Sequence, residues 1–533
     1  MTNSIPEFEI YTNCFLIMGS NTSEGHPLIA SRIMKAREER GAKLVVIDPR
    51  ETQMARLADL YVPFRPGSDV AVLNGLMNVI IGEGLQDQAY VAARTEGYEE
   101  MKAVVEQYTP ERVEEISGIP AEKLRQAARM YATNKPSAIV YAMGITQHTT
   151  GVDNVKSCAN LAMMCGNVGV AGGGVNPLRG QNNVQGACDV GGLPNVYPGY
   201  QPVTSQDAHD KFEKAWGSTS DMKVGLTVTE IVNAVGEGAV RGLFIMGENP
   251  MVADPDLNHA RHCLEQAEFL VVQDIFLSET AELAHVVLPG ASFAEKDGTF
   301  TGTDRRVQRV RKAIAPPGEA RADWEIICEL ARRMGGQGFN FASAKDVMAE
   351  VAQVTPSYGG VSYERLEELG FLHWPCPTPE HAGTPYLHKN KFSRGQGVFH
   401  AIEFKEPAEL PDEEYPFTLT TGRLMFHWHT GTMTRRSEKL EQEVPEAYVE
   451  IHPDDAAKIG LNGGKRVRVA SRRGEIELGV RVTPRIKPGI VFIPFHFAEA
   501  AANALTNAAV DPVAKIPEYK VCAVKIEPVS REQ

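Results

Sequence analysis

One arginine lies in a long loop that is rich in glycine and amide side chains. Residues 172–189 are mostly Gly, Asn and Gln, and Arg179 stands among them with few competing charges nearby in sequence. A guanidinium presents its donors as a planar fork that matches a carboxylate. Most arginines simply lie at the surface, but a loop this long inside a compact domain is usually functional or disordered. The composition therefore favours Arg179 as a binding residue for a small carboxylate.

Two histidines, two positions apart, form a second candidate. If His427 and His429 lay on a strand, they would share one face and could bind a metal there. A third ligand is not evident nearby, so hydrogen bonding to a polar ligand, or packing, fits the pattern better. Arg423, Arg435 and Arg436 flank the pair and suit an anionic ligand. The chain shows no nucleophile with an obvious base, so hydrolytic chemistry has no support.

Two similar turns follow apolar runs in the chain. Gly19 follows the run 15–18, and Gly247 follows the run 243–246. In each case a predicted helix and a further apolar run lead to an aspartate, Asp48 or Asp274. Such a turn presents backbone N–H groups to a phosphate, and the acidic residue can hold ribose hydroxyls. Neither turn has the three-glycine fingerprint. Two units favour two nucleotide halves, and the alternative is an internal duplication that only builds scaffold.

The elements that would position these residues can be read from hydrophobic patterns. Unbroken apolar runs predict buried parallel strands, and a helix is expected from about residue 27 with Gly41 as its stop. Beyond a probable linker at 405–416, short alternating runs predict a small β-barrel or sandwich. The predicted strands of the first part are 10–18, 44–47, 60–64, 138–144, 243–246 and 269–272.

Composition limits the possible partners. The 533 residues carry a formal charge of −14, which makes nucleic acid and anionic membrane surfaces poor partners. No run approaches the roughly 20 apolar residues of a membrane span, and we expect a cytoplasmic protein. Eight cysteines are scattered without a CxxC pair, which argues against a disulfide framework, a zinc site or an iron–sulfur cluster built from this chain alone.

These features together resemble one family. The segment 176–189 resembles the corresponding loop of molybdopterin-dependent formate dehydrogenase catalytic (alpha) subunits, in the molybdopterin oxidoreductase (DMSO reductase) family, and 517–524 is similar to the end of those subunits. The resemblance runs over essentially the whole chain. It implies oxidation of formate to CO2, or the reverse, at a molybdenum or tungsten ion held by two molybdopterin guanine dinucleotides. Two dinucleotides would account for the two turn units.

The resemblance also implies roles for single residues. Arg179 would bind the formate carboxylate beside the metal and stabilise the transition state, and Gln181 would line the cofactor. One dinucleotide would be held by Asn21, Asp48, Arg50, Gly67 and Asp69, and the other by Asn249, Gln273, Asp274 and Asp323. The pterin would be contacted by Met143, Gly144 and Gln147. The residues expected to close over the cofactor from the C-terminal domain are Arg423, His427, Asn503 and Tyr519.

The expected fold class is α/β, with two Rossmann-like doubly wound αβα units and a C-terminal β-barrel of the double-psi type. The expected boundaries give a first dinucleotide-binding domain with the arginine loop, a second dinucleotide-binding domain, a mixed segment that packs against an N-terminal cluster domain, and the C-terminal barrel domain. These four domains are predicted at 1–181, 182–293, 294–404 and 405–533.

The front of the chain departs from the family pattern. Relatives begin with a cysteine-rich [4Fe–4S] segment and later carry a Cys or selenocysteine metal ligand followed by His, and none of these is found here. We expect either a truncation, such as a selenocysteine codon read as a stop, or a separate N-terminal chain. The implied partner is an iron–sulfur electron-transfer subunit linked to NAD, a ferredoxin or a hydrogenase. A nitrate reductase-like enzyme and a scaffold subunit without cofactor remain as alternatives.

Overall fold

The computed structural model describes residues 1–217, 221–461 and 466–529. The chain divides into two compact units. The first comprises Met1–Leu178, Val252–Asn258 and Tyr386–Gln533, and the second comprises Arg179–Met251 and His259–Pro385. The first unit is therefore built from segments that lie far apart in the sequence.

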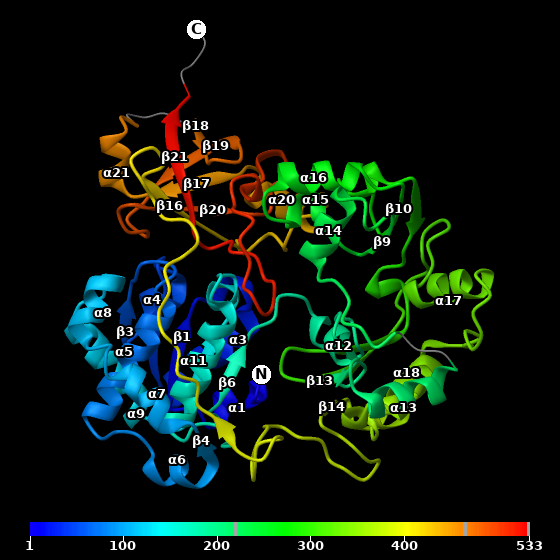
Figure 1. Ribbon diagram of the computed structural model, residues 1–533, viewed down its shortest axis with the longest axis horizontal. Coiled ribbons are helices and arrows are strands. Elements are labelled where there is room, and N and C mark those ends of the chain that lie inside the picture. The colour runs from blue at the N-terminus through cyan, green and yellow to red at the C-terminus, as the bar shows by residue number, and fades with distance from the viewer. Residues whose placement is uncertain (218–220, 462–465, 530–533) are drawn as a thin grey trace. The chain divides into compact units, whose positions relative to one another are not determined.

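A five-stranded parallel sheet forms one part of the first unit (Figure 1). Its strand order is β3-β2-β1-β5-β6. Every residue of β1 and of β5 is buried, as expected for parallel strands that are covered on both faces. The strands are β1 (Cys14–Met18), β2 (Lys43–Ile47), β3 (Leu60–Val62), β5 (Ser137–Tyr141) and β6 (Val175–Pro177).

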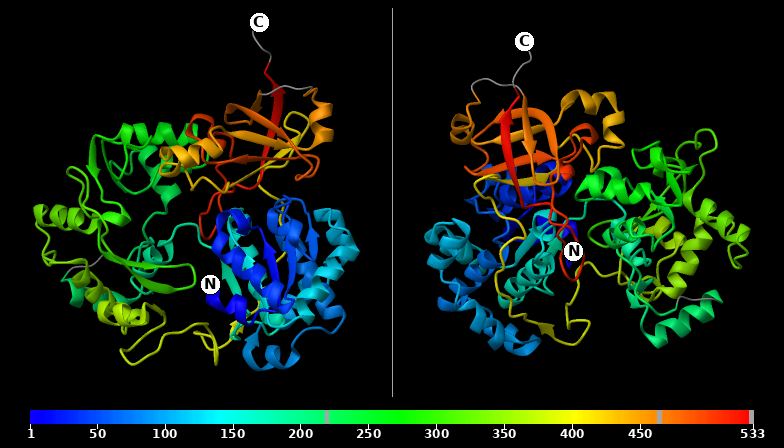
Figure 2. Two further views of the ribbon diagram at one scale, coloured as in Figure 1. Left: turned by 180° about the vertical axis from the view of Figure 1, so that it is seen from behind. Right: turned by 45° about the horizontal axis from the view of Figure 1, so that its top comes forward.

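The side chains of β1 alternate between two hydrophobic cores, one at each face of this sheet. Leu16 and Met18 belong to the core built with α5 (Asp69–Gly82), α9 (Ala121–Thr133) and α11 (Gly151–Met164). Phe15 and Ile17 belong to the core built with α1 (Ile5–Ile10) and α3 (Pro27–Arg40). The period of two along the strand thus explains the helices seen on both sides of the sheet in Figures 1 and 2. Further elements of this part are α2 (Thr22–Gly25), α4 (Gln53–Leu57), α6 (Gln88–Arg94), β4 (Thr95–Glu96), α7 (Tyr98–Val105), α8 (Pro110–Ser117) and α10 (Met143–Thr146).

The predicted helix from residue 27 is confirmed, and so is its stop. Gly41 caps α3 with a left-handed φ of 70° and donates its N–H to Arg37 O. The predicted strand 10–18 is wrong at its start, because residues 5–10 form α1 and the strand begins at Cys14. A proline in the first turn of α1 favours a helix start, and Phe8 packs edge-on against Phe15, with ring centroids 5.5 Å apart.

The second part of the first unit is a closed barrel with the strand order β16-β20-β17-β19-β18-β21. Figure 2 shows it in orange and red. Val467 and Val469 are buried while Arg466 and Arg468 are exposed, which is the alternation that the sequence shows. Of the barrel and the sandwich that the sequence left open, the barrel is confirmed. Its elements are β16 (Phe417–Gly422), α20 (Glu438–Glu443), β17 (Tyr448–Ile451), α21 (Pro453–Lys458), β18 (Arg466–Ala470), β19 (Glu475–Val482), β20 (Ile490–Pro494) and β21 (Cys522–Pro528).

The second unit holds a smaller parallel sheet with the strand order β11-β10-β9. Its core packs β9 and β10 against α14 and α16. An antiparallel sheet, β12-β13-β14, accompanies it in the same unit. The strands are β7 (Val196–Tyr197), β8 (Gln201–Pro202), β9 (Gly242–Met246), β10 (Phe269–Asp274), β11 (Val286–Pro289), β12 (Gly298–Thr301), β13 (Arg306–Val310) and β14 (Phe371–His373). The helices are α12 (Val184–Asp189), α13 (Gln206–Trp216), α14 (Val228–Gly236), α16 (Leu257–Glu265), α17 (Asp323–Arg333), α18 (Ala344–Val354) and α19 (Tyr363–Leu369).

Two parallel sheets and a C-terminal barrel confirm the predicted α/β class. The long loop predicted at 172–189 contains the short strand β6 and the helix α12. Within the described residues, no helix combines the length and the apolar content that a membrane span requires.

Candidate functional site

The turns after β1 and β5 contact each other backbone to backbone. These two strands are neighbours, and the strand order reverses between them, which places a crevice at their carboxyl ends. Gly144 N–H donates to Gly19 O at 3.0 Å. A Cβ atom added to Gly144 would lie 2.5 Å from Gly19 Cα. Only glycine at both positions allows so close an approach.

A pocket opens at this crevice, within the first unit. The turns after β1, β2, β3 and β5 line it, together with the end of β16, Phe492 and Lys520 from the barrel part. Ligands of open α/β sheets bind at such places. The residues predicted to hold a cofactor that line this pocket are Asn21, Asp48, Arg50, Asp69, Met143, Gly144 and Arg423.

Two buried ionisable residues that the sequence analysis did not single out also line the pocket. Lys520 is 6% exposed, and its Nζ donates to Thr421 O at 2.7 Å. His148 is buried, with its Nε2 2.9 Å from Gly144 O and 3.7 Å from an oxygen of Asp69. Lys520 directly follows Tyr519, and His148 directly follows Gln147, two residues to which the resemblance gave a role. This adjacency in the sequence was the signal that could have identified Lys520 and His148.

Burial shifts the two acids of the pocket toward their neutral forms. Asp69 is 1% exposed, and burial raises its pKa to about 8. Burial also raises the pKa of Asp48 to about 6, although Asp48 accepts the backbone N–H of Arg50 at 3.0 Å. The two carboxyls also interact with each other, and the charge of Asp48 raises the pKa of Asp69 further.

The basic groups are shifted in the opposite direction. Burial lowers the pKa of Lys520 to about 7, and the charge of Arg423 lowers it further. Burial lowers the pKa of Arg423 to about 10 and that of His148 to about 4. Acids and bases that are both pushed toward neutrality, in one pocket, are typical of a functional site.

The pocket also presents polar atoms without partners. Among the described residues, Asn21 Nδ2, Arg423 Nη1 and both carboxyl oxygens of Asp69 are buried and make no hydrogen bond. Buried polar groups are nearly always paired. The unpaired donors of the pocket suit a ligand with negatively charged acceptors, and the carboxyl oxygens of Asp69 suit hydrogen-bond donors on the same ligand. A guanine dinucleotide carries both kinds of group.

Arg50 is engaged inside the protein. It forms a fork with Glu450 of β17, with N–O distances of 2.6 and 2.7 Å, and lies over the ring of Phe492 at 4.0 Å. Gly67 does not line the pocket. A Cβ atom there would lie 2.4 Å from Pro407 Cγ, so its small size serves close packing.

The other predicted residues of the first unit lie outside the pocket lining. Gln147 has a buried Oε1 without a partner among the described residues. Asn503 donates to the carbonyls of Val252 and Ala253 at 3.0 and 2.9 Å, and Tyr519 OH donates to Ala253 O at 2.8 Å. Both therefore bind the segment 252–258 that belongs to this unit.

His427 and His429 do not lie on a strand, so the premise of a shared strand face is wrong. They follow the end of β16, in a segment of turns. His427 Nε2 lies 2.7 Å from Val444 O, and its ring packs edge-on against Phe497. Its Nδ1 is buried and has no hydrogen-bond partner among the described residues.

The second unit repeats the turn of the first. Gly247 has a φ of 63° and donates its N–H to Gln273 O, at the end of the neighbouring strand. Gly19 has a φ of 57° and donates to Ile47 O in the same way. The predicted repeat of strand, turn, helix and strand is therefore present in both sheets.

The polar residues around this second turn bond mainly to one another. Asn249 Oδ1 accepts the hydroxyl of Thr280 at 2.7 Å. Gln273 Nε2 donates to Asp323 at 2.8 Å, Lys296 pairs with the same carboxylate, and Gln273 Oε1 has no partner among the described residues. Asp274 accepts the N–H of Ile275 at 2.6 Å.

Arg179 and Gln181 lie at the start of the second unit. Arg179 N–H donates to Thr303 Oγ1 at 3.1 Å, and its Nη1 lies 3.6 Å from Cys188 Sγ. Gln181 is exposed. Arg179 therefore contacts a weak sulfur acceptor, which a stronger acceptor such as a carboxylate can replace.

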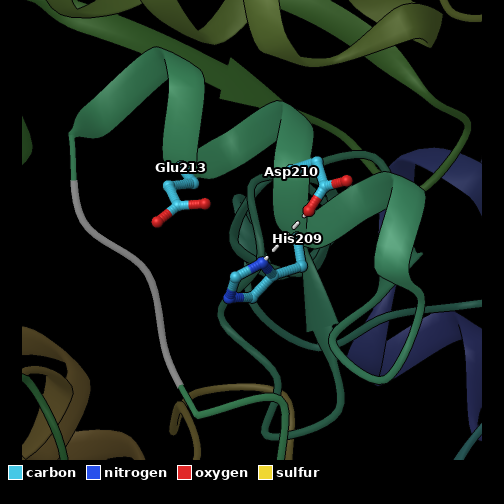
Figure 3. Close-up of side chains that lie close together, drawn as sticks. All are labelled: His209, Asp210 and Glu213. Atoms are coloured by element: carbon cyan, nitrogen blue, oxygen red, sulfur yellow. Dashed lines mark ion pairs between the residues drawn. The ribbon is translucent and has the colours of Figure 1, made fainter.

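Among the described residues, one group of side chains has metal-ligand composition. His209, Asp210 and Glu213 of α13 bring their ligand atoms within 4.8 Å of one another (Figure 3). The two acidic residues are exposed, and His209 Nδ1 lies 3.6 Å from Asp210. Exposed acidic groups on a helix are common without a metal, so this group remains a surface feature.

Comparison with family models matches most of the chain. The model described as "Molybdopterin oxidoreductase" covers residues 1–333, and the one described as "Molydopterin dinucleotide binding domain" covers residues 417–523. The pocket of the first unit takes residues from both matched regions.

Curated relatives and a solved structure agree with these matches. The chain is 54% identical over 532 residues to "F420-dependent formate dehydrogenase 1 subunit alpha" of Methanococcus maripaludis, covering 99% of this chain and 78% of that protein. It is 53% identical over 530 residues to "F420-dependent formate dehydrogenase subunit alpha" of Methanocaldococcus jannaschii, with the same coverage of both chains. The structure of acetylene hydratase from Pelobacter acetylenicus is similar, with a TM-score of 0.76 and 23% identity, over 99% of this chain and 81% of that one. That last likeness shows a shared fold.

Proposed function

Because this chain belongs to the molybdopterin oxidoreductase family, we propose that it is the major part of a formate dehydrogenase catalytic subunit. It would oxidise formate to CO2 or catalyse the reverse. The observation that carries the proposal is the 54% identity, over 99% of the chain, to a formate dehydrogenase alpha subunit. The matched dinucleotide-binding domain supports a bis(molybdopterin guanine dinucleotide) cofactor with molybdenum or tungsten. When bound, this group supplies the centre that accepts two electrons from formate.

We assign the residues of the pocket to one guanine dinucleotide. Asp69 offers two unpaired acceptors, which suit the N–H groups of a guanine edge or ribose hydroxyls. Asn21 and Arg423 offer unpaired donors for phosphate or pterin oxygens. Arg50 would act mainly by holding the pocket wall through Glu450. Met143 and Gly144 lie at the crevice and would contact the pterin, with Gln147 next to them in sequence.

Predicted cofactor-binding residues also lie around the turn after β9 and in the loop that holds Arg179. We assign Asn249, Gln273, Asp274 and Asp323 to the second dinucleotide, and Gln181 to the cofactor lining. Gly67, His427, Asn503 and Tyr519 would support the first site by packing and hydrogen bonding. The four predicted domains at 1–181, 182–293, 294–404 and 405–533 belong to the same proposal.

Arg179 is the proposed catalytic residue. Its guanidinium would bind the formate carboxylate, orient the C–H bond and stabilise charge in the transition state. Its weak contact with Cys188 Sγ supports this role, because a formate oxygen is a stronger acceptor than sulfur.

We further propose a partner that removes the electrons. An iron–sulfur subunit linked to NAD, a ferredoxin or a hydrogenase would serve, and a [4Fe–4S] cluster would need a cysteine-rich segment, which these 533 residues do not contain. The two relatives named above are F420-dependent by name, so coenzyme F420 is a further acceptor to test.

The test uses the cofactor-loaded enzyme from its native source, with Arg179→Ala and with Arg179→Lys as the control that keeps the charge. Removing a charged group that pairs with an anionic ligand costs about 2–5 kcal/mol once the ligand excludes water, so Arg179→Ala should lower kcat/KM for formate by roughly 30-fold to several thousand-fold. Arg179→Lys should lose less. The metal and pterin content should stay unchanged in both variants. A loaded Arg179→Ala enzyme with full formate turnover would remove the formate assignment to this residue.

The alternatives give different results in the same assays. A nitrate reductase-like enzyme would reduce nitrate and leave formate untouched. A scaffold subunit would contain neither metal nor pterin when purified from its native source.

A further inference from the structure

A buried carboxylate ends the helix that follows Arg179. Asp189 is the last residue of α12 and is 1% exposed. Its Oδ1 accepts from Gln185 Nε2 and from Tyr200 OH, both at 2.7 Å. Its Oδ2 accepts from Tyr358 OH at 2.6 Å. Both oxygens of this buried group are therefore satisfied by charge-assisted hydrogen bonds, the stronger kind.

The donors come from separate elements of the second unit. Gln185 lies on α12 itself, Tyr200 lies in the turn between β7 and β8, and Tyr358 ends the short helix η3 (Pro356–Tyr358). Tyr358 gives its proton to Asp189, so the hydroxyl of Thr301, 2.8 Å away, must donate to Tyr358. Asp189 thus connects α12 to β12 through a chain of hydrogen bonds.

Tyr200 reaches Asp189 from a strained backbone. Its φ is 59°, in the left-handed region that bulky residues avoid. A conformation of this kind persists only where the surrounding structure holds it, and such residues gather at functional sites. The hydroxyl of Tyr200 also accepts a hydrogen bond from Gln185 Nε2 at 3.0 Å.

The neighbour of Asp189 is the residue that Arg179 contacts. Arg179 Nη1 donates to Cys188 Sγ at 3.6 Å. Burial raises the pKa of Asp189, and the charge of Arg179 is among the effects that oppose this rise, so the two charges interact. The loop is tied to β12 at another point, where Asn183 Oδ1 accepts the N–H of Thr301 at 2.9 Å.

We propose that Asp189 is a positioning residue for Arg179, which it holds by fixing α12 and the sulfur of Cys188 against the guanidinium. Its three donors keep α12 in one orientation, and its charge attracts the guanidinium toward that helix. The role for formate rests on the proposed function, whereas the positioning of Arg179 does not.

The first test measures the position of the guanidinium without any substrate. All eight cysteines lie within the described residues, and Cys188 is the one that is partly exposed. Native labelling of the full chain with iodoacetamide, followed by peptide mass spectrometry, therefore reports the reactivity of Cys188. Arg179→Ala defines the labelling rate of this thiol without its guanidinium partner.

Asp189→Asn and Tyr358→Phe should move the labelling rate from the wild-type value toward that of Arg179→Ala. Tyr363→Phe is the matched control, because Tyr363 OH is buried and has no hydrogen-bond partner among the described residues. It should keep the wild-type rate. The inference is overturned if Asp189→Asn keeps that rate too, or if Arg179→Ala itself labels like the wild type.

The second test uses the cofactor-loaded enzyme and formate. A displacement of a binding group by about 1 Å can cost up to 100-fold in rate, so we expect Asp189→Asn to lower kcat/KM by at least tenfold. The loss should appear in kcat/KM, as for Arg179→Ala but smaller, and Tyr363→Phe should show none. Wild-type enzyme that is loaded but does not oxidise formate would reject the proposed function while the labelling result stands. Formate turnover with an unchanged kcat/KM in Asp189→Asn would reject the positioning role and leave the function in place.

Discussion

Five of the ionisable side chains in the pocket at the carboxyl ends of the first sheet are shifted toward their neutral forms. Asp48, Asp69, His148, Arg423 and Lys520 line it, and burial shifts the pKa of each toward its neutral form. An uncompensated buried charge destabilises a protein. A ligand that offers matching charges and hydrogen bonds would offset this effect, which is why we assign the pocket to a charged, polar ligand.

Asp69→Asn should stabilise the cofactor-free chain at high pH. The pKa of Asp69 is about 8 in the folded state and about 3.9 in the unfolded chain. Because the folded state holds the Asp69 proton more tightly than the unfolded chain does, protonation of Asp69 stabilises the folded state fully below pH 4. This stabilisation is lost as the pH rises to 8. The substitution should therefore raise the free energy of unfolding at pH 9 by about 1–3 kcal/mol and change it little at pH 4. Urea unfolding at both pH values measures the difference. An equal effect at pH 4 and pH 9 would contradict a buried Asp69 carboxyl with a raised pKa.

The sequence located part of this site and missed the rest for a physical reason. Asn21, Asp48 and Met143 follow strands directly, so a local pattern could place them at one edge of the sheet. Lys520 reaches the pocket from the segment just before the last barrel strand, and only its adjacency to Tyr519 in the sequence pointed to it. The condition for a shared face of His427 and His429, a strand, is not met, because the segment after β16 forms turns.

At the scale of elements, glycines determine how closely the turns after β1 and β5 approach each other. Gly19 and Gly247 share a left-handed φ and the same backbone hydrogen bond to the neighbouring strand. They differ in their surroundings. A Cβ atom on Gly19 would lie 2.6 Å from Gly144 C, whereas one on Gly247 would meet nothing within 4 Å.

This difference predicts unequal effects of the same substitution. Gly247→Ala should cost about 1–2 kcal/mol, because only the left-handed conformation is disfavoured. Gly19→Ala should cost about 1–3 kcal/mol more, because the turns must also move apart. Thermal unfolding of the two variants measures the effect, and the first-sheet variant should also bind less cofactor. Equal stabilities would show that the two turns do not touch.

The elements themselves were largely predictable. Apolar runs located the strands β1, β2, β5, β9 and β10, and a glycine located the end of α3. The short helix α1 was missed because its apolar residues merge with the strand pattern that follows. The antiparallel sheet β12-β13-β14 was not predicted. β12 and β13 follow each other closely in the chain, whereas β14 joins β13 across a long stretch of intervening chain, which no local pattern encodes.

At the scale of the whole molecule, buried polar contacts join the sheet part and the barrel part of the first unit. Arg50 follows β2 and Glu450 lies on β17, and their side chains are 6% and 3% exposed. Asn503 and Tyr519 add hydrogen bonds to the segment 252–258. Contacts between residues hundreds of positions apart leave no local pattern, so the sequence could predict the parts but not this joining.

Arg50→Met should destabilise the chain strongly. Breaking a buried pair leaves an uncompensated charge on Glu450 and costs about 3–5 kcal/mol. The double variant Arg50→Met, Glu450→Met should recover most of that loss. Arg241→Met is the control, because the Arg241–Glu268 pair is 74% and 58% exposed and should contribute less than about 1 kcal/mol. Urea unfolding of the four proteins gives the comparison, and similar losses for Arg50→Met and Arg241→Met would contradict the joining role.

We propose that this chain serves formate oxidation. The most direct measurement supplies ¹³C-formate and an electron acceptor to the enzyme purified from its native source, and follows ¹³CO2 and the reduced acceptor together. We expect one ¹³CO2 for each pair of electrons transferred. An enzyme that contains the metal and the pterin and reduces its acceptor from another donor, but releases no ¹³CO2 from formate, would contradict it.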